Sequence, residues 1–273
     1  MTTIYEPKGR AREYAALATN VYTRCDHGCL YCYVPGATRQ SREIFIKPTL
    51  RNGYLTNLEK DACKLSSTGN PIDQILLCFA CDPYQAFEVS QGITRQSLKI
   101  LNKHDLNFCI LSKGGSRALR DIDLYKPGDS FASTLTFVDD DKSLYREPGA
   151  SLPNDRISTI QEFHKSGIET WVSLEPVIEP KQSIESIYRT ADFVDLYKVG
   201  RMNHHIVGNE IDWRKFGIEA TELLESIGKH YYVKQDLAKE MPASSLTGEH
   251  RLTQRQIELA HRRIPYTIQK QLF

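Results

Sequence analysis

Three cysteines lie close together in the stretch TRCDHGCLYCYVPG (residues 23–36). Cys25, Cys29 and Cys32 follow the spacing C-x3-C-x2-C, and His27 is the only imidazole nearby. Cysteine thiolates bind zinc or iron–sulfur clusters. A structural zinc site usually takes four ligands from two separated pairs, so one short loop suits it poorly. A cubane [4Fe–4S] cluster is larger, and three cysteines would leave one of its irons open to a substrate or cofactor.

The stretch resembles the signature of the radical S-adenosylmethionine (SAM) superfamily, because an aromatic residue, Tyr31, precedes the third cysteine. The resemblance implies a [4Fe–4S] cluster on the three cysteines and SAM chelated at the open iron. One electron then cleaves SAM to a 5′-deoxyadenosyl radical, which abstracts hydrogen from a substrate. The protein orients this chemistry and excludes water from it.

More of the sequence, from about residue 17 to 200, resembles the spore photoproduct lyase-like branch of that superfamily. The resemblance is carried by DPYQ (82–85), LSKGGSRALRDIDL (111–124), STLTFVDDD (133–141), REPGASLPNDRISTI (146–160) and GIETWVSLEPVI (167–178). The lyase itself is longer, and its N-terminal portion has no counterpart here. The resemblance therefore implies the cofactor more directly than it implies the reaction.

The resemblance also implies which residues contact SAM: Tyr31, Tyr33, Asp82, Lys113, Ser133, Thr134 and Glu175. Tyr31 would pack near the adenine, Lys113 would pair with the SAM carboxylate, and Glu175 would meet the ribose hydroxyls. Each has an ordinary alternative. Asp82, expected near the SAM amino group, is also placed to cap the turn before Pro83. Lys113 and Glu175 would otherwise face water.

Two further cysteines, Cys78 and Cys81, form a C-x-x-C pair at the end of an expected strand. In photoproduct lyases, a cysteine three residues before the aspartate that matches Asp82 returns a hydrogen atom to the product radical. Phe79 stands at that position here. Cys81 is our candidate catalytic residue, with burial as a small apolar side chain as the alternative. Cys78 is predicted to be core.

The elements that must position these residues alternate between apolar runs and amphipathic runs. The expected strands cover residues 16–23, 73–80, 106–111, 130–137, 168–177, 193–200 and 230–234. The expected helices cover residues 53–65, 93–104, 116–125, 152–167, 182–190 and 212–228. This order predicts an α/β fold with a parallel sheet, a partial (β/α)6 TIM-like radical SAM barrel.

The barrel is expected to span residues 1–240, with a C-terminal helical extension over 241–273. LTQRQIELAHRRI (252–264) is a candidate helix of this extension. YYVKQDL (231–237) is a candidate closing segment of the barrel, with Lys234 at the mouth. In such barrels ligands bind at the carboxyl ends of the strands. Tyr197, Lys198 and Arg201 at one such end are candidates for substrate contact.

Composition limits the function classes. The 273 residues are 40% hydrophobic and 25% charged, with a formal net charge of +1. This balance argues against broad electrostatic binding to nucleic acid, although it allows a local basic patch. No apolar run approaches the length of a membrane span, and the N-terminus is polar, so a cytoplasmic protein with no membrane partner is expected. Seven cysteines speak against a disulfide framework, and Cys63 and Cys109 are predicted to be core.

The sequence thus predicts a radical SAM enzyme, lyase- or transferase-type, with a [4Fe–4S] cluster and SAM as cofactors. Its unidentified substrate is a small molecule, a peptide or a nucleic acid. A low-potential electron donor such as flavodoxin or ferredoxin would serve it. The alternatives are nucleic-acid lesion repair of the spore photoproduct lyase type and a non-catalytic zinc-binding protein.

Overall fold

The computed structural model describes residues 2–68, 74–203 and 206–246. Seven strands form one sheet in sequence order, and each neighbouring pair is parallel. The strands are β1 (Leu17–Thr19), β2 (Ile75–Leu77), β3 (Phe108–Ser112), β4 (Ser130–Thr134), β5 (Glu169–Leu174), β6 (Leu196–Val199) and β7 (His230–Val233). The predicted partial α/β barrel is therefore confirmed, and its seven strands match the seven expected apolar runs, one more than a (β/α)6 barrel has.

The barrel is open. In the described part of the chain, β7 pairs with β6 and no pairing joins it to β1. The segment 231–237 therefore extends the sheet, and the expectation that it closes the barrel is wrong. The candidate helix 252–264 and most of the expected extension lie outside the described residues.

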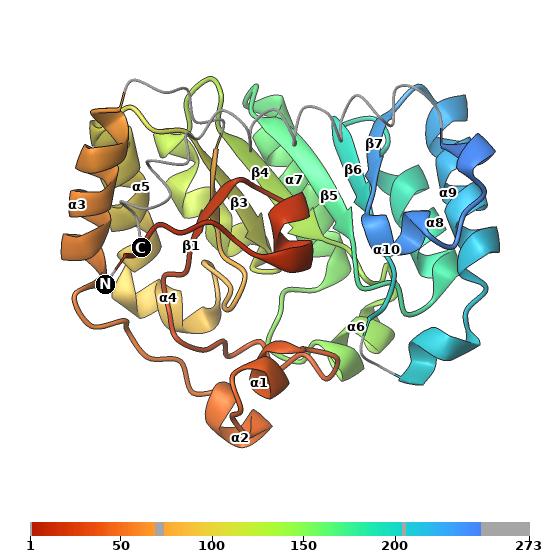
Figure 1. Cartoon of the computed structure of the whole chain (residues 1–273), viewed down its shortest axis with the longest axis horizontal. Coiled ribbons are helices and arrows are strands. Elements are labelled where there is room, and N and C mark those ends of the chain that lie inside the picture. The colour runs from red at the N-terminus through yellow and green to blue at the C-terminus, as the bar shows by residue number, and fades with distance from the viewer. Residues whose placement is uncertain (1, 69–73, 204–205, 247–273) are drawn as a thin grey trace.

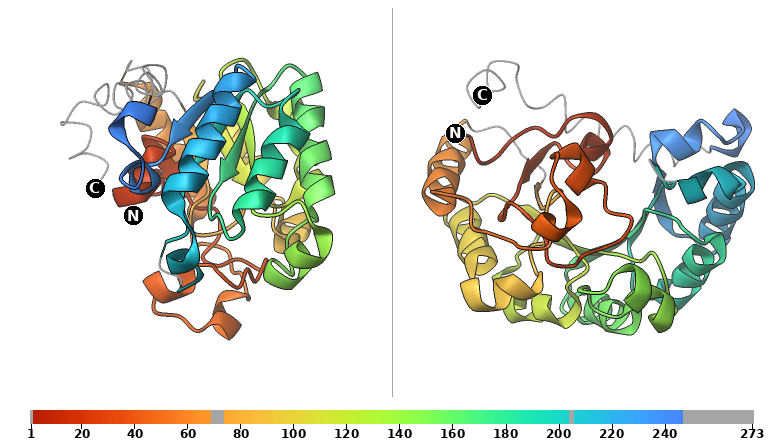
Figure 2. Two further views of the ribbon diagram at one scale, coloured as in Figure 1. Left: turned by 90° about the vertical axis from the view of Figure 1, so that its right-hand side faces the viewer. Right: turned by 90° about the horizontal axis from the view of Figure 1, so that it is seen from below.

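Helices cover the outer face of the sheet, as Figures 1 and 2 show. The long ones are α3 (Tyr54–Ser66), α5 (Ile93–Lys103), α7 (Pro153–Lys165), α8 (Pro180–Thr190) and α9 (Trp213–Ser226). Parallel strands need such crossovers, because a tight turn cannot join them. The main apolar core lies between these helices and the sheet, where for example Phe131 of β4 stacks on Phe163 of α7 with ring centroids 3.9 Å apart.

Short helices complete the fold: α1 (Val34–Ala37), α2 (Arg42–Phe45), α4 (Ala86–Gln91), α6 (Asp140–Arg146) and α10 (Gln235–Ala238). Their length is below what hydrophobic periodicity can signal, so the sequence did not predict them. The expected helix at 116–125 is a 3₁₀ helix, η2 (Gly115–Leu124). Among the described residues, no helix is long and apolar enough to cross a membrane.

The inner face of the sheet carries a smaller apolar cluster: Ala18, Leu76, Cys109, Ala132 and Trp171. Residues 2–16, which we name the N-terminal strap, run across this face (Figure 2, right). At one end Tyr5 exchanges backbone hydrogen bonds of 2.9 and 2.8 Å with Ala18 of β1. At the other end Glu13 accepts from the Tyr232 hydroxyl at 2.9 Å and from the Gln235 backbone N–H at 2.7 Å. The strap thus connects the two unpaired edges of the open barrel.

Candidate active site

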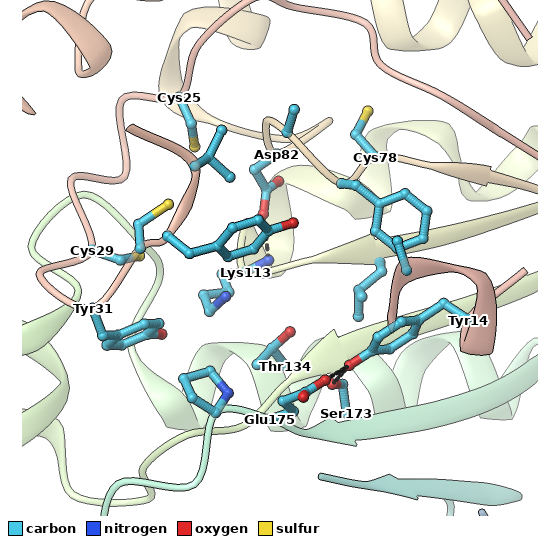
Figure 3. Close-up of a pocket in the computed structure, with 18 of the residues that line it drawn as sticks. Tyr14, Cys25, Cys29, Tyr31, Cys78, Asp82, Lys113, Thr134, Ser173 and Glu175 are labelled. Atoms are coloured by element: carbon cyan, nitrogen blue, oxygen red, sulfur yellow. Dashed lines mark hydrogen bonds between the residues drawn. The ribbon is translucent and has the colours of Figure 1, made fainter. Parts of the chain in front are cut away.

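A cavity of about 420 Å³ opens at the carboxyl ends of the strands. The cysteine loop, the strand ends and the strap line it, and Figure 3 draws 18 of the lining residues and labels ten of them. The cavity brings together most of the residues predicted from the sequence: Cys25, Cys29, Tyr31, Cys32, Tyr33, Cys81, Asp82, Lys113, Thr134 and Glu175. The first and last of these residues, Cys25 and Glu175, are 150 positions apart in the sequence, so the fold brings the site together.

The loop that carries Cys25, Cys29 and Cys32 is fastened mainly through its backbone. The Arg42 guanidinium donates to the carbonyl oxygens of Cys29 (3.0 Å) and Cys32 (3.2 Å). Gly149 donates its N–H to the His27 carbonyl at 2.8 Å, and a Cβ at Gly149 would come within 2.4 Å of the loop backbone. Glycine is therefore required there for the close approach. These bonds leave the thiols themselves facing the cavity.

The three cysteines are free thiols. Burial raises the pKa of Cys29 to about 12 and also raises the pKa values of Cys25 and Cys32. Backbone N–H groups of His27 and Val34 act in the opposite direction on Cys25 and Cys32. Thiolates must therefore form against burial, and a metal centre bound there would supply the compensating positive charge.

The donor set suits a cluster better than a closed zinc site, because three thiols come from one short loop and a structural zinc usually takes four ligands. A [4Fe–4S] cluster takes one thiolate at each of several separate irons, so its ligands stand further apart. Three thiols from one loop around a common cavity meet that requirement.

Asp82 ties the cysteine loop to the end of β3. Its carboxylate accepts from the Ser112 hydroxyl (2.6 Å) and from the backbone N–H groups of Lys113 (2.7 Å) and Tyr84 (2.8 Å). His27 Nδ1 lies 3.5 Å away. Burial pushes the pKa of Asp82 up, but His27 and these donors outweigh it and hold the pKa below its usual range. The carboxylate caps the turn, as the alternative interpretation had it, and it positions Lys113.

Tyr31 is fixed at the cavity wall by a buried ion pair. Its hydroxyl donates to Glu147, which also receives Arg156 Nη2 at 2.5 Å. Both Glu147 and Arg156 are buried. Lys113 Nζ lies 5.8 Å from the centroid of the Tyr31 ring, so an ammonium and an aromatic face border the same space.

Glu175, just beyond β5, belongs to a second polar group opposite the cysteines. Its Oε2 accepts from the Tyr14 hydroxyl at 2.6 Å and pairs with Lys234 Nζ. Tyr14 also shares a 2.9 Å hydrogen bond with Ser173. No described residue donates to Glu175 Oε1, so this oxygen is available to a ligand. Figure 3 shows Tyr14 and Glu175 across the cavity from Cys25 and Cys29.

Cys78 and Cys81 both line the cavity. Adjacent backbone N–H groups hold them: Val21 N lies 3.5 Å from Cys78 Sγ, and Tyr22 N lies 3.4 Å from Cys81 Sγ. Burial has the largest effect on the pKa of Cys78 and raises it, and the Cys81 thiol raises it further. The predicted burial of Cys78 is confirmed, but this residue also faces the site, which the sequence did not indicate.

Some predicted residues lie elsewhere. The Ser133 hydroxyl donates to the Ser112 carbonyl at 2.7 Å, and Ser133 does not line the cavity, because side chains alternate along a strand and Thr134 takes the inner position. Tyr197 is buried against Thr190 of α8 (2.8 Å), on the outer face. Cys109 is buried as predicted, whereas Cys63 is exposed on α3, so that prediction is wrong.

Tyr14 is the main residue that the sequence interpretation missed. It lies in the strap, whose polar sequence shows no periodicity that would attach it to the site. Ser173 was missed for a different reason, since one serine within an apolar strand carries no motif. Lys234 was expected at the mouth and does line the cavity.

No protein-family model and no curated protein matches the chain. Solved structures do resemble it in fold. A spore photoproduct lyase mutant superposes with a TM-score of 0.67 at 10% identity, covering 86% of this chain and 79% of the lyase. Another lyase mutant, with bound AdoMet and dinucleoside spore photoproduct, gives 0.64 at 11% identity, covering 81% and 76%.

Streptococcus suis SuiB bound to S-adenosylmethionine gives a TM-score of 0.60 at 12% identity. The match covers 79% of this chain, which spans about half the length of SuiB (49%). At these identities the comparison establishes the shared fold.

Proposed function

We propose that this chain is a radical SAM enzyme. One observation carries the proposal: Cys25, Cys29 and Cys32 line the same cavity as polar residues from the ends of β3, β4 and β5. A reduced [4Fe–4S] cluster on these cysteines would supply the electron that cleaves SAM to a 5′-deoxyadenosyl radical. Solved structures of two proteins that share the fold have SAM bound, which supports the choice of cofactor.

The chain's own residues would bind and orient SAM. Lys113 would pair with the carboxylate, because its ammonium lines the cavity and its backbone is fixed by Asp82. Glu175 would accept from the ribose hydroxyls through Oε1, while Tyr14 and Lys234 hold Oε2. Tyr31 would face the adenine, and Thr134 adds a hydroxyl to the same wall. Partial burial of these groups would limit the access of water to the radical.

Cys81 is proposed to return a hydrogen atom to the product radical. Its thiol lines the cavity, and the backbone N–H of Tyr22 holds it in place. An S–H bond breaks as a C–H bond forms, and the sulfur-centred radical remains on Cys81. Cys78 is a neighbouring thiol that could share that radical. Whether the overall reaction is of lyase or transferase type depends on the substrate.

The test is anaerobic reconstitution with iron and sulfide, followed by reduction with dithionite and measurement of 5′-deoxyadenosine formed from SAM. Wild type is compared with Cys29→Ala and with Cys63→Ala, which removes an exposed cysteine on α3. We expect about four irons per chain and 5′-deoxyadenosine from wild type and Cys63→Ala, and neither from Cys29→Ala. Stoichiometric zinc without iron would overturn the proposal in favour of a zinc-binding protein.

A further inference from the structure

Arg201 lies two residues beyond β6 and lines the cavity. Its guanidinium is held on two sides. The central carbon lies 5.1 Å from the centroid of the Trp213 ring, and Nη1 donates to Glu240. Trp213 is itself fixed by a 2.7 Å hydrogen bond from its Nε1 to the Gly208 carbonyl. The arginine therefore has a defined orientation at the cavity wall.

One edge of this guanidinium has no acceptor. Arg201 Nε is buried and forms no hydrogen bond, and Nη2 donates to no residue in the described part of the chain. A buried N–H without a partner is unfavourable, and native proteins satisfy nearly all such groups. The Nε and Nη2 groups point the same way and match two oxygens of a carboxylate or phosphate. This unpartnered edge therefore has the donor geometry of a bidentate anion site.

The surrounding charges favour an anion. Lys8 of the strap lines the same cavity, is exposed and has no described partner. Glu175, a carboxylate that lines the cavity just beyond β5, is already paired with Lys234. Gly200 lies against Glu175, since a Cβ there would come within 2.8 Å of Glu175 Cδ, so Arg201 borders the end of the cavity that we assign to the ribose.

This site is separate from Lys113. Lys113 follows β3 and Arg201 follows β6, so three strand pairings separate the strand ends that carry them. We therefore assign the two cations to different anions. If Lys113 holds the SAM carboxylate, the anion at Arg201 belongs to another molecule.

We propose that Arg201 is a specificity-determining residue that binds a carboxylate or phosphate of the substrate through its Nε and Nη2 groups, with Lys8 adding positive charge. The assignment of this anion to the substrate rests on the proposed function. The substrate class is thus an anionic molecule whose charged group lies at the β6 end of the cavity, away from the cysteine loop.

The experiment measures anion binding directly, by calorimetry on cluster-loaded protein saturated with SAM, with inorganic phosphate and glutarate as probes. Arg201→Gln should weaken binding about tenfold. Arg201→Lys should weaken it by several-fold, because lysine keeps the charge but lacks the paired N–H donors that match two oxygens. Glu240→Gln should tighten binding by several-fold, because it removes a competing carboxylate. A gain of affinity cannot come from misfolding. Arg214→Gln, an exposed position on α9, should match wild type.

The stronger of the two probes identifies the group as phosphate or carboxylate. Equal affinity in wild type and Arg201→Gln, or no binding of either anion by wild type, would overturn the proposal. So would loss of SAM affinity in Arg201→Gln, because Arg201 would then serve the cofactor. Binding through Arg201 in protein that forms no 5′-deoxyadenosine overturns the proposed function instead and leaves the anion site standing.

Discussion

At the scale of single residues, burial decides how the ionisable side chains beneath the cavity behave. Lys198 of β6 is the clearest case. Its Nζ lies 4.4 Å from the centroid of the Trp171 ring and donates to the Tyr14 carbonyl at 2.9 Å. Burial lowers the pKa of Lys198 to about 8. Lys198 does not line the cavity, so its predicted contact with substrate is wrong. Its hydrogen bond to Tyr14 holds the strap instead.

Lys198→Met should change how stability depends on pH. The folded protein binds fewer protons than the unfolded chain between about pH 8 and the ordinary lysine pKa near 10.5. Wild type should therefore gain stability relative to the variant as the pH rises through this window, by about 2 kcal/mol at pH 9.5, with no relative change below pH 7. Urea unfolding of both proteins under reducing conditions measures this. A constant difference from pH 7 to 9.5 would contradict the lowered pKa.

Tyr14→Phe should weaken SAM binding without removing it. The variant loses the hydrogen bonds to Glu175 and Ser173, while Lys234 still holds Glu175. We expect a 3- to 10-fold increase in the Kd for SAM, about the value of one or two hydrogen bonds. Equilibrium binding to cluster-loaded protein measures it, with exposed Tyr188→Phe as the control. An unchanged Kd would mean that Tyr14 does not orient Glu175 toward the cofactor.

At the scale of elements, a buried ion pair joins the cysteine loop to the helices behind it. Arg156 of α7 contacts Glu147, at the end of α6, and Glu147 holds the Tyr31 hydroxyl. Burial pushes the pKa of Glu147 up, but Arg156 outweighs it and keeps the pKa below its usual range. The loop therefore depends on helices that follow it by more than 100 residues.

Arg156→Met should destabilise the protein by about 3–5 kcal/mol, because Glu147 would be left buried and unpaired. The double variant Glu147→Gln with Arg156→Met should recover much of this loss, since no isolated charge remains. Denaturant unfolding of the two variants and wild type tests the comparison. A double variant that is as unstable as the single one would show that the packing, and not the lone charge, is responsible.

The sequence predicted the seven strands because each is an apolar run that ends at a polar stretch, and the cysteine spacing predicted the metal loop. It could not separate Ser133 from Thr134, because only the register of β4 decides which one faces the cavity. Pairings such as Arg156 with Glu147 have no local signal at all. Most of the cavity wall was predictable from motifs, whereas the contacts that orient it depend on packing.

At the scale of the whole molecule, the strap takes the place of a strand pairing. It contacts β1 through Tyr5 and the β7 end through Glu13, and it covers the inner face that an open barrel would expose to water. It also contributes Lys8 and Tyr14 to the cavity. A polar segment with no periodicity gave no sign of this role.

Glu13→Ala should loosen the strap while leaving the sheet folded. The variant removes the acceptor of the Tyr232 hydroxyl and the Gln235 N–H. Hydrogen exchange should become faster in residues 5–19 and 231–238, and stay unchanged in α3 and α5, because low-stability segments open locally. Glu219→Ala, exposed on α9, is the control. Faster exchange throughout the chain would indicate global destabilisation instead.

The strap also sets the order in which the molecule is assembled. Glu13 meets Tyr232 and Gln235 across separations of 219 and 222 residues. Bringing such distant residues together costs chain entropy that only a finished sheet can offset. We therefore expect the strap, and Tyr14 with it, to reach the cavity only after β7 has joined the sheet.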